Sequence, residues 1–198
     1  MKKITIIIPC FNEAESIPEL IRKLSLIKDD FNFLIVNNGS TDNTLDVIKK
    51  LNIPTNISFI KKDINTGYGA GIKYGIEFVR TEYTGWMHGD LQQNPSVLLN
   101  AKEMIFSKTY QETRQDIAFK GYRTGRTLFE NFFTAGVAIL SSLLFFDLYW
   151  DIAGQPNIFK TSSLKFLDNA PDDHNFEFYV YIFILKYIIH CYYGKFRK

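Results

Sequence analysis

The chain has 198 residues and a net charge of +2. A chain of this length forms one ordinary domain and buries roughly two thirds of its unfolded surface, so neither disulfides nor metals are needed for a core. The small charge argues against nucleic acid as a partner, because nucleic-acid binding needs a basic face. Cys10 and Cys191 belong to no metal-binding spacing, and we interpret both as reduced thiols.

The amino end begins with two lysines and a short apolar run that stops at Pro9, followed by Asn12 and Glu13. This run is too short for the apolar core of a signal peptide. We therefore expect a cytoplasmic protein.

Strand and helix patterns alternate through the first half. Lys3–Ile8 is a continuous β-branched run, typical of a parallel strand covered on both faces. A helix follows from Ser16, with Pro18 in its first turn and apolar residues at helical spacing as far as Ile27. Strand, helix, strand, helix and strand patterns then occupy about residues 31–36, 45–51, 57–60, 65–78 and 83–87. This βαβαβαβ order predicts an α/β fold with a mainly parallel sheet flanked by helices.

The second half has a different pattern. Ile117–Tyr122 indicates a strand, Thr127–Phe146 a long helix, and Asp151–Phe159 another extended segment. No linker composition divides the chain, so we predict a single domain.

Two apolar stretches lie in this half. Asn131–Phe146 carries no formal charge, and Phe176–Tyr193 is apolar except for one glutamate, one lysine and one histidine. Neither reaches the ~20 uninterrupted apolar residues of a membrane span. We favour buried core helices over the alternative, helices that lie in a membrane interface.

Four polar segments follow the predicted strands. In an open parallel sheet, ligands bind beyond the carboxyl ends of the strands, so these segments are the candidates for a site. Each segment alone also has an ordinary interpretation as a turn or a helix cap. The segments are Pro9–Glu13, Asn37–Asp42, Asn65–Gly71 and His88–Gln92.

The residue types in these segments suit a nucleotide. Capping explains Ser40, Thr41 and Asp42, but it does not explain the two preceding amides, which could read a nucleobase edge. The glycine loop lacks the Walker and dinucleotide spacings, yet the helix after it could favour a diphosphate. Asp90 follows a strand and could hold a divalent cation.

In this order the four segments resemble the family 2 glycosyltransferases, inverting enzymes with the Rossmann-like GT-A fold. The resemblance runs from about Lys3 to Phe159, and Gly85–Gln92 is most similar to bacterial polyprenyl-phosphate sugar transferases. It implies a nucleotide-sugar-binding half over about residues 1–106 and an acceptor-side half over about 107–198. It also implies a UDP-, GDP- or dTDP-linked donor and a lipid phosphate or growing glycan as acceptor. The implied role is cell-envelope polysaccharide synthesis, with peripheral contact at the inner face of the cell membrane.

The resemblance assigns a metal site. Asp90 matches the last aspartate of the DxD signature, Gln92 matches a glutamine that often follows it, and His88 stands where the first aspartate is usual. The implied cofactor is Mn²⁺ or Mg²⁺; imidazole suits manganese, whereas magnesium prefers oxygen. Asn38 replaces the aspartate of the usual pattern VDDGS and would face the base. The implied nucleotide-binding residues are Pro9, Asn12, Glu13, Asn38, Ser40, Asn65 and Gly69.

The acceptor side is assigned in the same way. Arg123 and Arg126, close to Lys120, would hold the leaving diphosphate or an acceptor phosphate; the alternative is that these are ordinary solvated charges. Asp151 and Gln155 resemble the family's acceptor-side segment, in which Asp151 would be the general base.

Two departures keep other functions open. After Phe176 the family continues with a further strand and a basic loop, whereas this chain stops at Lys198, so we expect a shortened acceptor side. The alternative function is a degenerate, non-catalytic sugar-nucleotide-binding protein. An enzyme that makes nucleotide sugars is a weaker rival, because the glycine- and arginine-rich loop after its first strand is missing.

Overall fold

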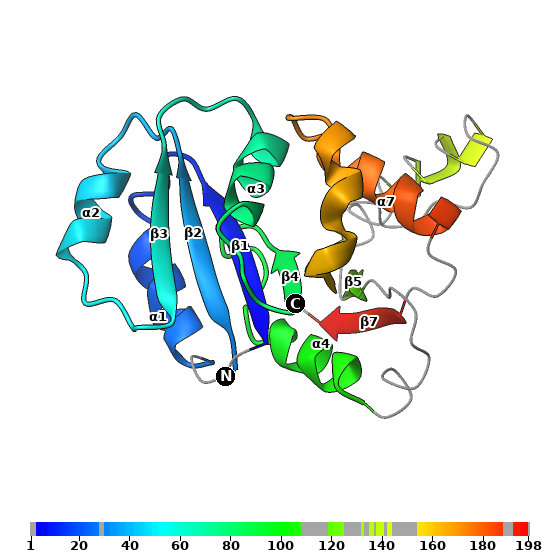
Figure 1. Cartoon of the computed structure of the whole chain (residues 1–198), viewed down its shortest axis with the longest axis horizontal. Coiled ribbons are helices and arrows are strands. Elements are labelled where there is room, and N and C mark those ends of the chain that lie inside the picture. Colours follow the sequence, from blue (N-terminus) through cyan, green and yellow to red (C-terminus); the bar gives the residue numbers. More distant parts are fainter. Residues whose placement is uncertain are drawn as a thin grey trace.

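The structure is a computed structural model that describes residues 3–27, 30–107, 119–124, 132, 135–136, 138–140, 142–143, 154–187 and 192–197. The described part is built on a seven-stranded sheet in the order β3-β2-β1-β4-β6-β5-β7 (Figure 1). The strands are β1 (Ile4–Cys10), β2 (Asn32–Asn38), β3 (Ile57–Lys62), β4 (Tyr83–Trp86), β5 (Phe119–Thr124), β6 (Asn157–Lys160) and β7 (Tyr192–Arg197). The helices are α1 (Ile17–Ser25), α2 (Thr44–Lys50), α3 (Tyr68–Ile76), α4 (Val97–Ile105), the 3₁₀ helix η1 (Thr161–Asn169) and α7 (Phe176–Tyr187).

The first half forms the parallel sheet predicted from the alternating pattern. β1 pairs in parallel with β2 on one side and with β4 on the other, and β2 pairs in parallel with β3. The chain therefore builds outward from β1 to β3 and then returns to the opposite side of β1. Such a reversal of strand order opens a crevice at the carboxyl ends of the two strands that flank it, here β1 and β4.

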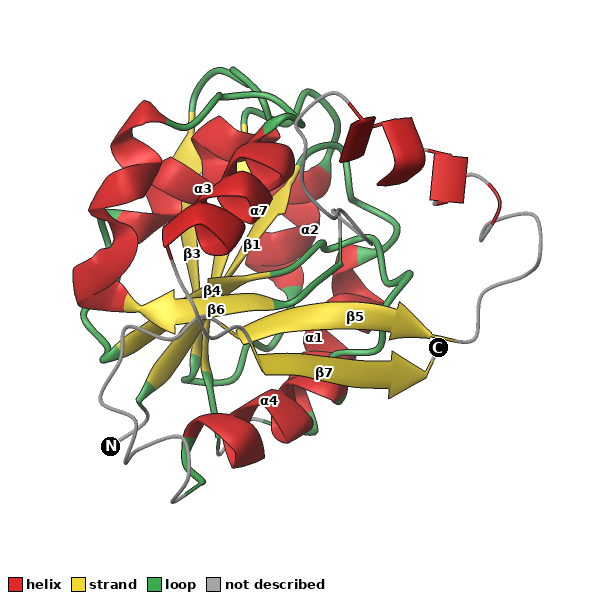
Figure 2. Ribbon diagram, turned by 90° about the vertical axis from the view of Figure 1, so that its right-hand side faces the viewer, coloured by secondary structure: helices red, strands yellow, loops and turns green. Residues whose placement is uncertain are grey.

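The second half extends this sheet in mixed directions. β6 runs antiparallel to both β4 and β5, and β5 and β7 lie side by side in the same direction (Figure 2). β5 and β6 correspond to the strand and the extended segment predicted there. A further strand, β7 (Tyr192–Arg197), follows α7. The shortened acceptor side stays a prediction. The apolar stretch 176–193 is divided between α7 and the start of β7.

Alternation along β1 divides the core into two layers. Ile6 and Ile8 face the layer that contains α1, α2 and α4, whereas Ile7 faces the layer that contains α3, η1 and α7. All three side chains are fully buried, each contributing about 1.5–3 kcal/mol by leaving water. Burial on both faces is why this strand is almost entirely apolar; its one hydroxyl, on Thr5, accepts a hydrogen bond from Thr81 Oγ1 at 2.8 Å.

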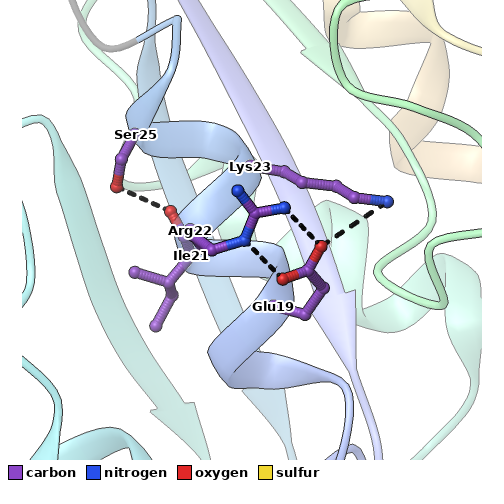
Figure 3. A network of polar contacts seen from close by, with 5 residues as sticks. All are labelled: Glu19, Ile21, Arg22, Lys23 and Ser25. Carbon is purple, nitrogen blue, oxygen red and sulfur yellow. Dashed lines mark hydrogen bonds and ion pairs between the residues drawn. The ribbon is translucent and has the colours of Figure 1, made fainter.

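α1 shows how the helices are held on the sheet. Ile17, Leu20 and Leu24 are buried on one face, and the opposite face carries ion pairs from Glu19 (Figure 3). The Glu19 carboxylate accepts from Arg22 Nε at 2.6 Å and lies 3.9 Å from Lys23 Nζ. Exposed pairs of this kind contribute little to stability because water and salt screen them, so the apolar face determines where α1 lies.

The described parts of residues 132–143 are helical and lie at the edge of the molecule (Figure 1). The prediction for this stretch is a buried core helix. That prediction is wrong for four of its large side chains. Phe132, Ile139, Leu140 and Leu143 are 60–73% exposed. Within the described ranges, no helix combines the length and apolarity needed to cross a membrane.

Candidate active site

A cleft of about 320 Å³ lies at the switch point between β1 and β4. All four polar segments predicted from the sequence contribute to it, and so does a fifth segment that precedes α7. The lining residues are Pro9, Cys10, Phe11, Glu13, Asn38, Asn65, Gly67, Tyr68, His88, Gly89, Asp90, Asp173 and His174.

The described lining of the cleft is acidic. It contains three carboxylates, Glu13, Asp90 and Asp173, and neither lysine nor arginine. Burial, with a smaller effect of the negative charges of Glu13 and Asp90, raises the pKa of the Cys10 thiol far above its usual range. An anion therefore needs a positive counter-charge to bind against this lining.

Asn38, at the end of β2, lines the cleft and carries a buried hydrogen-bond acceptor. Its Nδ2 donates to the carbonyl oxygen of Gly67 at 2.9 Å and to Oδ1 of Asn65 at 3.3 Å. Asn38 is 3% exposed, and among the described residues its buried Oδ1 has no hydrogen-bond partner. An unpartnered buried acceptor costs about 1–3 kcal/mol, so this atom is suited to a ligand that donates.

Asn12 and Ser40 join the first two polar loops to each other. Asn12 Oδ1 accepts from the backbone N–H of Thr41 at 2.9 Å, and the Asn12 N–H donates to Ser40 Oγ at 3.0 Å. Capping was the wrong interpretation of Ser40 and Thr41, since both contact Asn12 instead. Asn12 has a positive φ of 57° and is exposed. The pair holds the two loops together beside the cleft without lining it.

Asp90 lies in a tight turn after β4. Its Oδ1 accepts from the backbone N–H of Gln92 at 3.1 Å, and Leu91 between them has a positive φ of 60°. The Asp90 side chain is exposed to the cleft, whereas Gln92 is outside the lining residues. Asp90 is therefore available to a ligand.

Three rings from separate segments are stacked along one wall of the cleft. Tyr68, at the start of α3, packs against His88 with ring centroids 4.8 Å apart and against His174 with centroids 5.6 Å apart. The Tyr68 hydroxyl donates to Glu177 at 3.2 Å and accepts from Gln155 at 2.7 Å. Burial, followed by the charge of Glu177, raises the pKa of Tyr68 well above its usual range.

Gly67 and Gly69 let the fifth segment approach α3. A Cβ on Gly67 would lie 2.3 Å from the carbonyl oxygen of Asp172, and one on Gly69 would lie 2.3 Å from that of Pro171. Lys73 donates to the carbonyl oxygen of Ala170 at 2.7 Å and secures the same contact. Gly69 is thus buried against this segment and is not among the lining residues.

The acceptor-side residues are only partly described. Asp151 and Arg126 lie outside the described residues, and Arg123 is placed in β5 without its side chain. The solvated interpretation is wrong for Lys120, which is 1% exposed. Its Nζ donates to the carbonyl oxygen of Gly154 at 2.9 Å and lies 5.2 Å from the ring centroid of Tyr181.

The side chains present fit a cation that is shared with a ligand. Within the described ranges, no group of three or more His, Cys, Asp or Glu side chains could hold a metal by itself. Mg²⁺ is commonly held by one or two carboxylates together with substrate phosphates, and Asp90 supplies one such carboxylate. His88 lines the same cleft and could add an imidazole ligand.

Sequence reasoning missed Asp173 and His174, and it gave Tyr68 no role. The polar run from Asp172 to Asn175 separates two apolar stretches, and this was the available signal. Its position became evident only from the contact between this segment and α3, in which Ala70 N–H donates to the Asp172 carbonyl oxygen at 2.9 Å.

Several solved structures share this fold. The chain matches a mannosyltransferase from Pyrobaculum calidifontis in complex with GDP-Man and Mn²⁺ with a TM-score of 0.66 and 16% identity, covering 99% of this chain and 56% of the other. It matches TarS 1–349 of S. aureus with a TM-score of 0.57 and 24% identity, covering 87% and 51%. It matches glucosyl-3-phosphoglycerate synthase from Mycobacterium tuberculosis, in complex with Mn²⁺, UDP and glucosyl-3-phosphoglycerate, with a TM-score of 0.70 and 13% identity, covering 99% and 70%. The chain thus spans little more than half the length of the first two structures.

The sequence itself gives a closer assignment than these distant structures. A sequence profile of glycosyl transferase family 2 matches residues 5–134, which include β1 to β5 and the predicted donor-side segments. The α/β fold with its mainly parallel first half agrees with this match. The chain belongs to glycosyl transferase family 2.

Proposed function

We propose that this chain is an inverting glycosyltransferase that binds a nucleoside-diphosphate sugar in the cleft between β1 and β4. The observation that supports this most directly is the unpartnered Asn38 Oδ1, buried at a cleft that also presents Asp90. A base at Asn38 and a diphosphate near Asp90 would use both features.

The orientation of Asn38 favours particular bases. Because the carbonyl oxygen of Gly67 can only accept, Nδ2 must face Gly67, and Oδ1 is the end proposed to accept from the base. The ring N–H of uracil, thymine or guanine could satisfy this acceptor. The proposed donors are accordingly UDP-, dTDP- and GDP-linked sugars.

A divalent cation would resolve the conflict between an anionic donor and an acidic cleft. We propose Asp90 as its carboxylate ligand, with His88 and Gln92 as further candidates and the donor diphosphate completing the coordination. Two of the similar structures were solved with Mn²⁺. The cation would supply electrostatic stabilisation of the leaving diphosphate.

The proposed reaction is an in-line displacement at the anomeric carbon. The acceptor oxygen forms a bond to that carbon while the bond to the diphosphate oxygen breaks, and the electron pair leaves with the nucleoside diphosphate. Attack from the opposite face inverts the configuration. Arg123 and Arg126 are proposed to hold the leaving diphosphate or an acceptor phosphate, and Asp151 is proposed as general base for a hydroxyl acceptor.

We propose a lipid phosphate such as a polyprenyl phosphate as the acceptor, in cell-envelope polysaccharide synthesis. A phosphate acceptor is largely ionised near neutrality and needs no base. The exposed side chains of Phe132, Ile139, Leu140 and Leu143 support contact with the inner face of the membrane that would hold such a lipid.

Calorimetric titration tests the donor half of this proposal. The purified chain is titrated with UDP, GDP and dTDP, each with Mn²⁺ and with EDTA, and release of nucleoside diphosphate from UDP-glucose and GDP-mannose is then measured. Selective, metal-dependent binding with turnover supports the proposal. Binding without turnover indicates the non-catalytic alternative, and absence of binding to all three nucleotides contradicts both.

A further inference from the structure

A buried hydrogen-bond network lies beneath the cleft, centred on Glu177 in α7. Glu177 is 6% exposed, and its carboxylate accepts hydrogen bonds from four different side chains. Oε1 accepts from Trp86 Nε1 at 3.0 Å, from Gln155 Nε2 at 2.8 Å and from the Tyr68 hydroxyl at 3.2 Å. Oε2 accepts from Asn157 Nδ2 at 2.8 Å. Only a group with several acceptor sites satisfies this set of donors.

Lys120 supplies the charge that balances this buried carboxylate. Its Nζ lies 3.4 Å from Asn157 Oδ1, so the Asn157 amide bridges the ammonium group and Glu177. Lys120 and Glu177 come from β5 and α7, and Asn157 comes from β6 between them. The network thus ties together elements that are distant in sequence.

The network determines which way the Gln155 side chain faces. Gln155 Nε2 donates to both Glu177 and the Tyr68 hydroxyl, which uses both of its hydrogens. Its Oε1 is consequently left to accept from the backbone N–H of His88 at 2.8 Å. If the amide turned over, Nε2 would face the His88 N–H, and two donors would oppose each other.

Gln155 holds the Asp90 turn at both ends. At the start, its Oε1 accepts from His88 N–H; at the end, its backbone carbonyl oxygen accepts from Gln93 Nε2 at 2.7 Å. Asp90 lies between these two anchors, and its own carboxylate is placed by the turn itself. The position of Asp90 therefore depends on Gln155, and the orientation of Gln155 depends on Glu177.

We propose that Glu177 is a positioning residue that holds the Asp90 turn in the geometry required for the metal and the donor diphosphate. This inference rests on the proposed function, since it assumes a cation at Asp90. Glu177 touches neither ligand; it acts through Gln155 and through Tyr68, which packs against His88. The Asn38 side chain donates its hydrogen bonds to Gly67 and Asn65 and not to the residues of this network.

The test compares Glu177→Gln with two further variants. Gln93→Ala removes the distal anchor of the turn while leaving the buried network intact, so it remains informative if Glu177→Gln does not fold. Val180→Ala is the matched control, because it truncates a fully buried apolar side chain one turn along α7 that can take no part in the hydrogen-bond network. Urea unfolding establishes the stability of each variant.

Two affinities are then measured for each folded variant. Electron paramagnetic resonance of free Mn²⁺ gives metal affinity in the presence of the nucleoside diphosphate that the wild type prefers, and calorimetry in EDTA gives nucleotide affinity without metal. Loss of a partner that orients a metal ligand lowers metal affinity about 10–100-fold, so Glu177→Gln should weaken Mn²⁺ binding by at least about tenfold. Gln93→Ala should shift it in the same direction. Neither should change nucleotide affinity in EDTA, and Val180→Ala should change neither affinity.

The possible outcomes separate the two proposals. If the wild type binds Mn²⁺ with none of the nucleotides, the proposed function fails. If the wild type binds but Glu177→Gln and Gln93→Ala keep its Mn²⁺ affinity, the positioning role alone is wrong. A parallel loss of both affinities in Glu177→Gln would also overturn the positioning role, because it would indicate general disruption of the cleft.

Discussion

The side-chain nitrogen of Asn38 donates to the carbonyl oxygen of Gly67 at 2.9 Å, and this bond identifies the other end of the amide as the acceptor, Oδ1. The end of β2 and the start of α3 are thereby joined at the point where a base is proposed to bind. Asparagine also makes this contact without adding a fourth carboxylate to a cleft lined by Glu13, Asp90 and Asp173.

Replacing this acceptor should weaken nucleotide binding. We expect Asn38→Ala to lose about tenfold in affinity for the preferred nucleoside diphosphate, corresponding to the loss of one hydrogen bond of about 1–1.5 kcal/mol. Calorimetry measures this directly. Asn56→Ala is the control, since Asn56 is a buried asparagine remote from the cleft lining that donates to the carbonyl oxygen of Phe31 at 3.1 Å. Equal nucleotide affinity in Asn38→Ala and the wild type would refute the assignment of Asn38.

Removing the Asp90 carboxylate should separate metal binding from folding. The Asp90 side chain is exposed and accepts a local hydrogen bond from the Gln92 N–H. We therefore expect the free energy of unfolding of Asp90→Ala to lie within about 0.5 kcal/mol of the wild-type value. Its Mn²⁺-dependent nucleotide binding and donor turnover should be lost. Thermal melting with and without Mn²⁺ and UDP provides the measurement, with the exposed Asp46→Ala on α2 as control. Unchanged turnover in Asp90→Ala would rule out the proposed metal site.

The donor side of the cleft was predictable because it depends on a topological rule. A parallel sheet brings the carboxyl ends of its strands to one edge, so Pro9, Asn38, Asn65 and Asp90 could be grouped without knowledge of any side-chain contact. The unpartnered state of Asn38 Oδ1 could not be predicted, since it results from the approach of Gly67. Local polarity likewise gave a wrong interpretation of Ser40, which contacts Asn12.

The other side of the cleft was less predictable because long-range contacts create it. Lys120 has the sequence context of a solvated charge, yet β6 and α7 enclose it and Asn157 links it to Glu177. Asp173 and His174 reach the cleft only because their segment docks on α3. No periodic pattern encodes such contacts.

Adding a side chain at Gly67 should detach the segment that precedes α7 from its contact with α3. Gly67 has a φ of +119°, and a Cβ would lie 2.3 Å from the Asp172 carbonyl oxygen, a backbone atom that cannot move aside easily. We expect Gly67→Ala to destabilise the fold by about 1–3 kcal/mol from the backbone conformation alone, as measured by urea unfolding. Hydrogen exchange at Ala70 N–H, which donates to Asp172, should accelerate.

Gly136→Ala is the control for this substitution, because in the described part of the chain a Cβ there has nothing within 4 Å. Its stability should be unchanged or slightly raised, as for glycine to alanine in a helix. If Gly67→Ala were as stable as Gly136→Ala, the close docking of the segment would be wrong.

The raised pKa of Tyr68 should make stability fall at high pH. Burial and the charge of Glu177 keep this phenol protonated in the folded chain, whereas an unfolded tyrosine loses its proton near pH 10. The folded state then binds the extra proton, so the contribution of Tyr68 is fully present below about pH 10 and declines above it by up to about 1.4 kcal/mol per pH unit. The free energy of unfolding of the wild type should therefore fall relative to that of Tyr68→Phe as the pH rises through this range. Urea unfolding of both proteins between about pH 9 and 11 measures it; a difference that stays constant would mean that Tyr68 is not held as a neutral phenol by Glu177.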